Sequence, residues 1–399
     1  MIVHPESSGK MNPGMLSHLK VLDLSRLFPG PYATQMLADL GAEVVKIEAP
    51  GEGDYMRFME PLKDGVSTFF ANLNRNKESV CLDLKNPTAR DVFLKMAEKA
   101  DVVFESFRPG VMEKLGAGYD KLKEVNPGLV YCAITGYGTS GPMARAAGHD
   151  LNYIALSGLL SQLKDRAGDP IVPGFQIADV GGGALHGVIG VLAALVERGM
   201  TGAGRRIDVS MTDSLAPWLV YPWSEMQAGR GRPGAGTLTG RFACYRTYRT
   251  MGGGHLAVGA LEPKFWKALC SHLGKPEWIP LQFAEGETRE KLIKDMEGVF
   301  EGKTRDRWVE ELLPVDCCVT PVLELNELAD SPHWKARGLV VADVEGSFPP
   351  GALAPAFALE GEPAMRRPPG LGEHTIEVLK RYGIGEDEIK AATGPDRSA

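Results

Sequence analysis

Strand and helix signals alternate along the first half of this chain, and this alternation limits its fold more than any other feature. Short apolar runs typical of buried strands lie at Val21–Leu24, Val44–Ile47, Ser79–Leu84, Val102–Phe104 and Leu129–Ile134. Helical patterns separate several of them, at Tyr32–Leu40 and at Thr88–Lys99, the second opened by Asn86 and Pro87. Strands that alternate with helices form parallel sheets with helices on both faces, so the sequence predicts an α/β fold with a Rossmann-like layout.

The second half of the chain predicts a further, smaller α/β unit. Gly181–Gly199 is the most apolar helix, and its apolar positions nearly encircle it, which predicts burial on all sides. The segment 229–240, GRGRPGAGTLTG, is typical of a mobile loop or linker. Beyond it, His255–Leu261 and Val319–Leu325 are predicted strands, and Pro263–Leu273 is a predicted helix.

Composition excludes several classes of protein. Hydrophobic residues make up 44% of the chain and charged residues 24%, as in globular proteins, and the net charge of −7 favours neither nucleic acid nor an anionic membrane as a partner. We expect no membrane-spanning segment and no signal peptide. The six cysteines have neither zinc-ligand nor C-x-x-C spacing, so we expect no metal site and a reducing, cytoplasmic location.

Asp179, in the segment IADVGGGALHG, is the first candidate for chemistry. It stands at the start of a predicted helix beside three glycines, which leave backbone N–H groups bare and admit a ligand closely. Such N–H groups can stabilise a negative oxygen that develops on a substrate. The alternative is that Asp179 only caps its helix, although a cap alone does not require three glycines.

Two further acid–base candidates precede predicted helices. His149 lies in Gly148-His149-Asp150, where imidazole suits proton transfer near neutral pH, and Asp150 is expected to cap the helix Leu151–Leu160. Glu262 lies at the end of a predicted strand, where a carboxylate can face a crevice or simply favour the helix dipole.

Candidates for binding an anion are basic side chains and one glycine-rich turn. Arg75 and Lys77 lie in NLNRNKES and Arg108 in SFRPG, while Gly136, Tyr137 and Gly138 belong to the turn TGYGTSG, which has hydroxyls that can cradle phosphates. Charged pairs on solvated loops remain the alternative for the basic residues. The sequence contains neither a Walker motif nor a complete G-x-G-x-x-G after a strand.

Taken in order, these segments resemble the class III coenzyme A-transferase family (CaiB/BaiF), which also contains the α-methylacyl-CoA racemases. The matching stretches include LKVLDLSRLFPGPYATQMLADLGAEVVKIEAPGEGD, FRPGVMEKLG, GHDLNYIALSG, IADVGGG and LAVGALEPKFW, and they cover most of residues 16 to 330. The resemblance implies a large coenzyme A-binding domain over 1–225, a small α/β domain over 226–330 and a segment 331–399 that returns to the large domain. It also implies an interlocked homodimer that acts on an acyl-CoA, with coenzyme A as part of the substrate and no separate cofactor.

The resemblance assigns roles to three residues. The aspartate matching Asp179 is the nucleophile of the transferases and one of the two bases of the racemases. The histidine matching His149 is the opposing base of the racemases, and the glutamate matching Glu262 pairs with it. Because GHD and LEP are both present, the site resembles the racemase version.

Three hypotheses follow from these assignments. The first is a racemase of 2-substituted, in particular 2-methyl, acyl-CoA that exchanges the α-proton through an enolate with two bases. The second is a transferase that moves coenzyme A to a carboxylic acid through an aspartyl-CoA intermediate, and the stretches VVKIEAPGEGD and NRNK are closer to that branch. The third is a coenzyme A-binding subunit without chemistry of its own.

Overall fold

The computed structural model describes residues 14–165, 167–229, 236–340, 352–354 and 365–393. The chain divides into two compact units: residues 1–160, 171–217 and 332–399 form unit 1, and residues 161–170 and 218–331 form unit 2. The first boundary thus falls at 217 rather than at the expected 225, and a short stretch around 165 belongs with unit 2. Half of the expected glycine-rich loop, residues 230–235, and much of the segment 331–371 lie outside the described residues.

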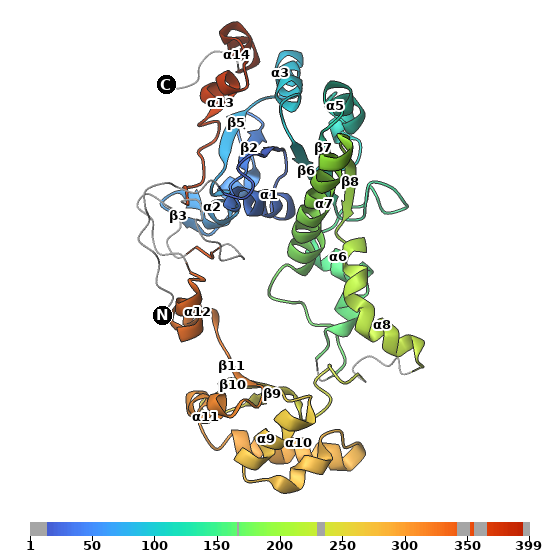
Figure 1. Ribbon diagram of the computed structural model, residues 1–399, viewed down its shortest axis with the longest axis vertical. Coiled ribbons are helices and arrows are strands. Elements are labelled where there is room, and N and C mark those ends of the chain that lie inside the picture. The colour runs from blue at the N-terminus through green and yellow to red at the C-terminus, as the bar shows by residue number, and fades with distance from the viewer. Residues whose placement is uncertain (1–13, 166, 230–235, 341–351, 355–364, 394–399) are drawn as a thin grey trace. The chain divides into compact units, whose positions relative to one another are not determined.

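Unit 1 is built on a six-stranded parallel sheet in the order β5-β2-β1-β6-β7-β8 (Figure 1). The strands are β1 (Lys20–Asp23), β2 (Glu43–Glu48), β5 (Glu78–Cys81), β6 (Val102–Glu105), β7 (Val130–Thr135) and β8 (Arg206–Ser210). Counted along the chain, this is the order 3-2-1-4-5-6 of doubly wound nucleotide-binding sheets. The predicted α/β fold with a parallel sheet is therefore confirmed, and the order reverses between β1 and β6.

Helices cover both faces of this sheet. The helices of unit 1 are α1 (Pro29–Asp39), α2 (Thr68–Asn74), α3 (Pro87–Ala97), α4 (Val111–Lys114), α5 (Tyr119–Val125), α6 (Asp150–Leu156), the π-helix η3 (Ala178–Leu185), α7 (His186–Thr201), α12 (Pro332–Arg337), α13 (Thr375–Arg381) and α14 (Glu386–Thr393), with the 3₁₀ turn η1 (Tyr55–Phe58) and the hairpin β3 (Leu62–Lys63) and β4 (Val66–Ser67). The predicted start of α3 is confirmed, because Asn86 Oδ1 accepts the N–H of Thr88 at 2.9 Å and Pro87 opens the helix.

Alternate residues of each strand supply the two cores. On one face, Leu22 and Val45 pack with α3, α5, α13 and α14. On the other face, Val21 and Val44 pack with α1 and α7. A strand that is buried on both faces must be apolar at successive positions, which is the reason that these strands appear as continuous apolar runs in the sequence.

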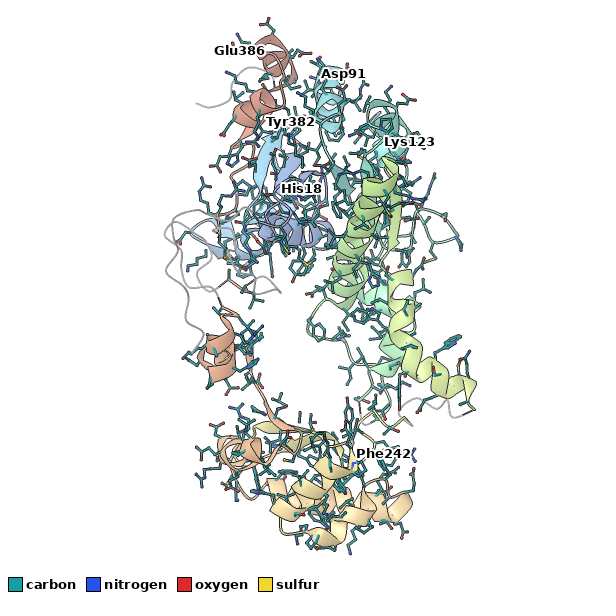
Figure 2. All side chains as sticks on the ribbon, in the orientation of Figure 1. His18, Asp91, Lys123, Phe242, Tyr382 and Glu386 are labelled. Atoms are coloured by element: carbon teal, nitrogen blue, oxygen red, sulfur yellow. The ribbon has the colours of Figure 1, made fainter. Side chains whose placement is uncertain are left out.

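The end of the chain completes the first of these cores. Helix α13 packs on β5 and α14 packs beside α3 (Figure 1). The buried ring of Tyr382, which follows α13, lies 5.4 Å from the ammonium group of Lys20 at the start of β1 (Figure 2). Residues from both ends of the chain therefore build one sheet-and-helix layer.

One helical segment, Ala178–Thr201, is by length and composition long and apolar enough to cross a membrane, which alone is weak evidence, so the expectation of no membrane-spanning segment stays a prediction. The segment packs against α1, β7 and β8 of unit 1, and such helices also occur in the cores of soluble proteins. Its outer stripe is nevertheless left exposed by the part of the chain that the structure describes: Leu185, Ile189, Val196 and Met200 are 40–79% exposed. Burial on all sides is thus not observed.

Unit 2 contains a three-stranded antiparallel sheet in the order β11-β10-β9. Its elements are α8 (Val220–Gln227), β9 (Tyr245–Arg249), β10 (His255–Gly259), α9 (Pro263–His272), α10 (Gly286–Phe300), α11 (Arg305–Leu312) and β11 (Val319–Val322), with 3₁₀ turns between them. The core of this unit contains several buried aromatic residues, including Phe242 (Figure 2), Tyr248, Trp266 and Trp308. This is the smaller α/β unit that the sequence predicts.

Candidate active site

A cavity of about 480 Å³ opens at the carboxyl ends of the strands of unit 1. Three of its walls are segments at or just beyond the carboxyl ends of strands: 26–29 after β1, 106–109 after β6 and 135–137 at the end of β7. The first two flank the point where the strand order reverses, which is where open α/β sheets bind their ligands. The strand order thus determines where the cavity lies. The other residues that line the cavity determine which reactions it can support.

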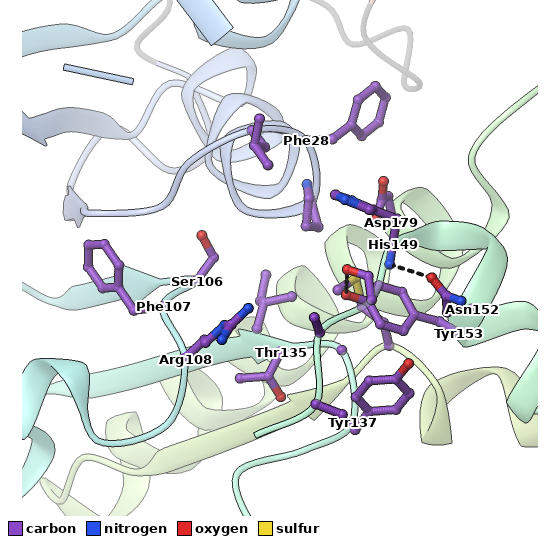
Figure 3. A pocket seen from close by; sticks show the side chains of 18 of the residues that line it. Phe28, Ser106, Phe107, Arg108, Thr135, Tyr137, His149, Asn152, Tyr153 and Asp179 are labelled. Carbon is purple, nitrogen blue, oxygen red and sulfur yellow. Dashed lines mark hydrogen bonds between the residues drawn. The ribbon is translucent and has the colours of Figure 1, made fainter. Parts of the chain in front are cut away.

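Asp179 and His149 both line this cavity, and Figure 3 shows them there together. Asp179 comes from the first turn of η3, and His149 from the position that precedes α6. The structure therefore brings together two of the three acid–base candidates, although 29 residues separate the neighbouring Asp150 from Asp179 along the chain. Two proton-transferring groups in one cavity are the arrangement that α-proton exchange needs.

The carboxyl group of Asp179 is only partly exposed, and its surroundings favour the protonated form. Burial, and then the nearby charge of Asp150, raise the pKa of Asp179 to about 7. A carboxyl group with this pKa can both give and accept a proton near neutral pH. Asp179 is thus tuned as an acid–base group.

Asp150, not Asp179, caps the helix that carries Asp179. One oxygen of Asp150 accepts the N–H groups of Ala178 at 2.6 Å and of Asp179 at 2.9 Å. The expectation that Asp150 caps its own helix is therefore wrong, and so is the alternative that Asp179 is a cap. These two N–H groups are occupied, so they are not free to bind a substrate oxygen as the sequence suggests.

Two of the three glycines beside Asp179 serve packing rather than the approach of a ligand. Gly181, Gly182 and Gly183 are buried. A Cβ atom on Gly182 would lie 2.5 Å from the carbonyl oxygen of Met211, and one on Gly183 would lie 2.9 Å from Pro29. Because neither distance is possible without a shift, the glycines let η3 approach β8 and α1 closely.

His149 is exposed, and its backbone is fixed from two sides. Its N–H donates to Asn152 Oδ1 at 3.0 Å (Figure 3), and the hydroxyl of Tyr153 donates to the carbonyl of the preceding Gly148 at 2.5 Å. Tyr153 packs edge-on against Tyr137. The imidazole thus extends into the cavity from a rigid base.

Gly136 and Tyr137 also belong to the cavity, but their turn does not cradle an anion. A Cβ atom on Gly136 would lie 2.3 Å from the ring of Tyr153, so glycine is required there for packing. Gly138 is not among the lining residues, and the next N–H, that of Thr139, donates to the carboxylate of Asp208 at 2.9 Å. Because an acidic side chain already takes this donor, the predicted phosphate cradle at Gly138 is not formed.

Two arginines supply the positive charge of the cavity. The predicted Arg108 lines it and is exposed, and no hydrogen bond or ion pair of its guanidinium is found among the described residues. Arg26, which the sequence analysis does not single out, lines it too and lies over the ring of Phe107 at 5.3 Å. Either guanidinium can pair with an anionic substrate group.

Arg75 and Lys77 do not face the cavity. Arg75 pairs with Asp39 at 2.6 Å, and Lys77 pairs with Asp23 at 3.1 Å, with both side chains buried. Burial lowers the pKa of Lys77 to about 8 even though Asp23 opposes that shift. Since both cations form ion pairs with buried carboxylates, this arrangement argues against the prediction that they bind a ligand.

Glu262 lies in unit 2, at the position that precedes α9. Its carboxylate is exposed and makes no capping hydrogen bond, and its place at the start of α9 is compatible with the alternative that it favours the helix dipole. The cavity, by contrast, is formed within unit 1. The pairing of Glu262 with His149 stays a prediction.

Several lining residues carry no sequence signal strong enough to be found in advance. They are Arg26, Phe28, Tyr55, Ser106, Phe107, Asn152 and Tyr153. The available signal for Arg26 and Ser106 is their place just beyond a strand, which becomes informative only when the strand order is known.

Comparison with known proteins identifies the family of this chain. The sequence model described as CoA-transferase family III matches residues 16–375. The human alpha-methylacyl-CoA racemase is 36% identical over 377 residues, which cover 94% of this chain and 95% of that protein. The human succinyl-CoA:glutarate CoA-transferase is 32% identical over 387 residues, which cover 93% of this chain and 88% of that protein.

The fold agrees as well. A solved CAIB/BAIF family protein from Brucella suis has a TM-score of 0.80 and 28% identity, and the match covers 93% of this chain and 100% of that one. The two named human relatives are both enzymes, one a racemase and one a transferase. The chain therefore belongs to CoA-transferase family III, the CaiB/BaiF proteins, and is an enzyme of the group that contains acyl-CoA racemases and CoA-transferases.

Proposed function

We propose that this enzyme racemises 2-substituted, in particular 2-methyl, acyl-CoA thioesters, with His149 and Asp179 as its two bases. The observation that carries the proposal is that both side chains line one cavity. Inversion at the α-carbon needs one group that removes the proton from one face and another that returns a proton to the opposite face. A transferase mechanism requires the aspartate as nucleophile but does not require the histidine.

The electrostatics of the cavity support this assignment. Because the pKa of Asp179 is raised to about 7, both its protonated and ionised forms are present near neutral pH, as a base that must also act as an acid requires. A nucleophilic aspartate, by contrast, works only when it is ionised. Each turnover moves one proton from carbon to one base and one proton from the other base to carbon, so charge and protons balance.

The N–H groups at the start of η3 already donate to Asp150. Other groups must therefore stabilise the enolate oxygen. The residues available for this are Arg26 and Arg108, together with the amino-terminal end of α1, where Phe28 and Pro29 line the cavity. We also propose that Glu262 pairs with His149 during the reaction, as in the racemases that the chain resembles. A Glu262→Gln variant with unchanged exchange kinetics would refute this pairing.

The decisive experiment follows the α-proton. A chiral 2-methylacyl-CoA is incubated with the enzyme in deuterated water, and we expect deuterium at the α-carbon together with loss of optical purity. His149→Gln and Asp179→Asn should each reduce racemisation by about 10²–10⁴-fold. His18→Gln is the control, since His18 is exposed and does not line the cavity. The absence of exchange with every branched thioester tested would refute the proposal.

The second candidate function is transfer of coenzyme A to a carboxylic acid, with Asp179 as the nucleophile. Similarity to the human succinyl-CoA:glutarate CoA-transferase over 93% of the chain favours it. It predicts an adduct on Asp179 that hydroxylamine removes and that appears when a donor such as succinyl-CoA is added. Detection of this adduct by mass spectrometry, with no deuterium exchange, would replace the racemase by the transferase.

We further propose that the enzyme works as an interlocked homodimer. The supporting observation is the exposed apolar stripe of Leu185, Ile189, Val196 and Met200, because large uncovered apolar surfaces mark interaction sites. Native mass spectrometry should give the mass of two chains. A monomer at micromolar concentration with full activity would exclude the dimer.

The remaining expectations are also proposals: a cytoplasmic location, and no cofactor beyond the coenzyme A of the substrate. The six cysteines are all free in the structure, which is compatible with a reducing compartment. Dialysis against a chelator should leave the exchange rate unchanged, and cell fractionation should recover the enzyme in the soluble fraction.

A further inference from the structure

Leu27, on the wall of the cavity, has a backbone conformation that leucine rarely adopts. Its φ is +62°, in the left-handed region, where a Cβ atom is crowded by the backbone. Leu27 lies between Arg26 and Phe28, and all three line the cavity (Figure 3 shows Phe28). A strained residue persists only when its surroundings hold it, so something must fix this wall.

The carboxylate of Asp54 is in position to do so. Its Oδ1 accepts the N–H of Leu27 at 3.3 Å and also the N–H of Met56 at 3.1 Å. Met56 follows Tyr55, which lines the cavity as well. A single carboxylate group therefore joins two separate segments of the cavity wall.

A buried lysine fixes this carboxylate in turn. Lys46, in the middle of the sheet on β2, pairs with Asp54 Oδ2 at 3.0 Å and donates to the carbonyl of Ser25 at 2.9 Å. The side chains of Lys46 and Asp54 are each 1% exposed. Lys46 thus holds the turn after β1 directly at Ser25 and indirectly, through Asp54, at Leu27.

We propose that Asp54 is a positioning residue for catalysis, because it keeps Leu27 in its left-handed conformation and so aligns the wall that faces the substrate. The inference rests on the proposed function for its kinetic effect, but it concerns binding of any coenzyme A thioester. When the accepting side-chain oxygen is lost, Leu27 relaxes to negative φ, and the segment 26–28 moves with it. A displacement of a cavity wall by about 1 Å can cost about 10²-fold in rate.

The test uses two substitutions of Leu27 that differ in how well the new residue tolerates a positive φ. Leu27→Asn and Leu27→Ala both remove the apolar side chain, but asparagine tolerates the left-handed region and alanine does not. Asp54→Ala is made in the wild type and in each of these variants. We measure kcat/KM for α-proton exchange and, by calorimetry, the Kd of a non-reactive thioether analogue of the acyl-CoA.

Asp54→Ala should reduce kcat/KM by about 10²-fold in the wild type and in the Leu27→Ala background. In the Leu27→Asn background the loss should shrink to about tenfold or less, because the backbone no longer needs to be held there. Asp54→Asn should stay close to the wild type in kcat/KM, since its Oδ1 can still accept both N–H groups, although it breaks the ion pair with Lys46. Equal losses in the two Leu27 backgrounds, or an equal loss with Asp54→Asn, would overturn the proposal.

Asp101→Ala is the matched control. One oxygen of Asp101 accepts the N–H of Lys20 at 2.8 Å and the other pairs with Arg198 at 2.9 Å, so it combines the same two roles at the opposite end of β1. It should lower the melting temperature without changing kcat/KM, and a 10²-fold loss there would show that general destabilisation explains the effect.

One replacement variant and one binding measurement keep the role of Asp54 testable. If Asp54→Ala does not fold, Asp54→Glu replaces it in the same comparison, because it keeps the charge but shifts the oxygens by one methylene. Normal binding of the analogue by a wild type that exchanges no proton would refute the racemase, whereas the binding data would still decide the role of Asp54.

Discussion

The Asp150 carboxylate links the structure of the site to its acidity. It accepts the N–H groups at the start of η3, and its charge contributes to the raised pKa of the neighbouring Asp179. The same carboxylate therefore caps η3 and raises the proton affinity of Asp179. Two consequences can be measured, one in kinetics and one in stability.

Asp150→Asn should lower the pKa of Asp179 from about 7 while retaining an oxygen that accepts the two N–H groups. For the stereoisomer from which Asp179 removes the proton, the exchange rate falls as this carboxylate becomes protonated, so the acid limb of the pH–rate profile should move to lower pH. The shift should be partial, because burial is the larger cause. An unmoved limb would show that Asp150 does not influence Asp179 electrostatically.

Asp179→Asn should stabilise the protein at alkaline pH. A carboxyl group whose pKa is higher in the folded than in the unfolded state binds more protons when folded, so stability is lost as pH rises from about 4 to about 7. Above pH 7 the variant avoids this cost, which we place at about 2 kcal/mol after allowance for partial exposure. Melting temperatures should differ at pH 8 and coincide at pH 4, and a difference that does not depend on pH would contradict this account.

At the scale of elements, the closeness of η3 to β8 and α1 decides where Asp179 stands. Gly182→Ala inserts a methyl group 2.5 Å from the Met211 carbonyl oxygen, and such overpacking costs about 1–3 kcal/mol. The helix must move away, so activity should fall together with stability.

Gly199→Ala is the matched control for this change, because Gly199 lies exposed in α7 and has no atom within 4 Å of an added Cβ. It should raise the free energy of unfolding by up to about 1 kcal/mol, since alanine favours the helix. Thermal melts of both variants measure the difference, and destabilisation by Gly199→Ala would show that the helix itself, rather than its contact, is sensitive.

At the scale of the whole molecule, the end of the chain helps to complete the core of the first unit. Leu379 of α13 is fully buried beside residues of β1, β2 and β5. Leu379→Ala should therefore cost about 2–5 kcal/mol, as for other buried leucines. Ile376→Ala, in the same helix but 51% exposed, should change stability by no more than about 0.5 kcal/mol. Similar melting temperatures for the two variants would mean that α13 does not belong to the cooperative unit.

Most strands of the central sheet and several helices, among them α1, α3, α7 and α9, could be predicted from the sequence, because local signals specify them. A strand buried on both faces must be apolar along its length, and Asn86 followed by Pro87 can begin a helix without help from distant residues. Asp179 and His149 were also identifiable, since glycines and a histidine at helix starts are unusual and match a known family. The sequence by itself thus determined the fold class and five residues that line the cavity: Asp179, His149, Arg108, Gly136 and Tyr137.

The tertiary structure decided which charged side chains line the cavity and which form ion pairs inside the fold. Arg75, Lys77 and Arg108 are equally basic in the sequence, but the first two are neutralised by aspartates inside the fold while Arg108 lines the cavity. The same holds for Asp150, whose partners lie 28 and 29 residues away. Local sequence encodes the backbone pattern, whereas the partner of a charged group depends on contacts between distant segments, which form only when the chain folds.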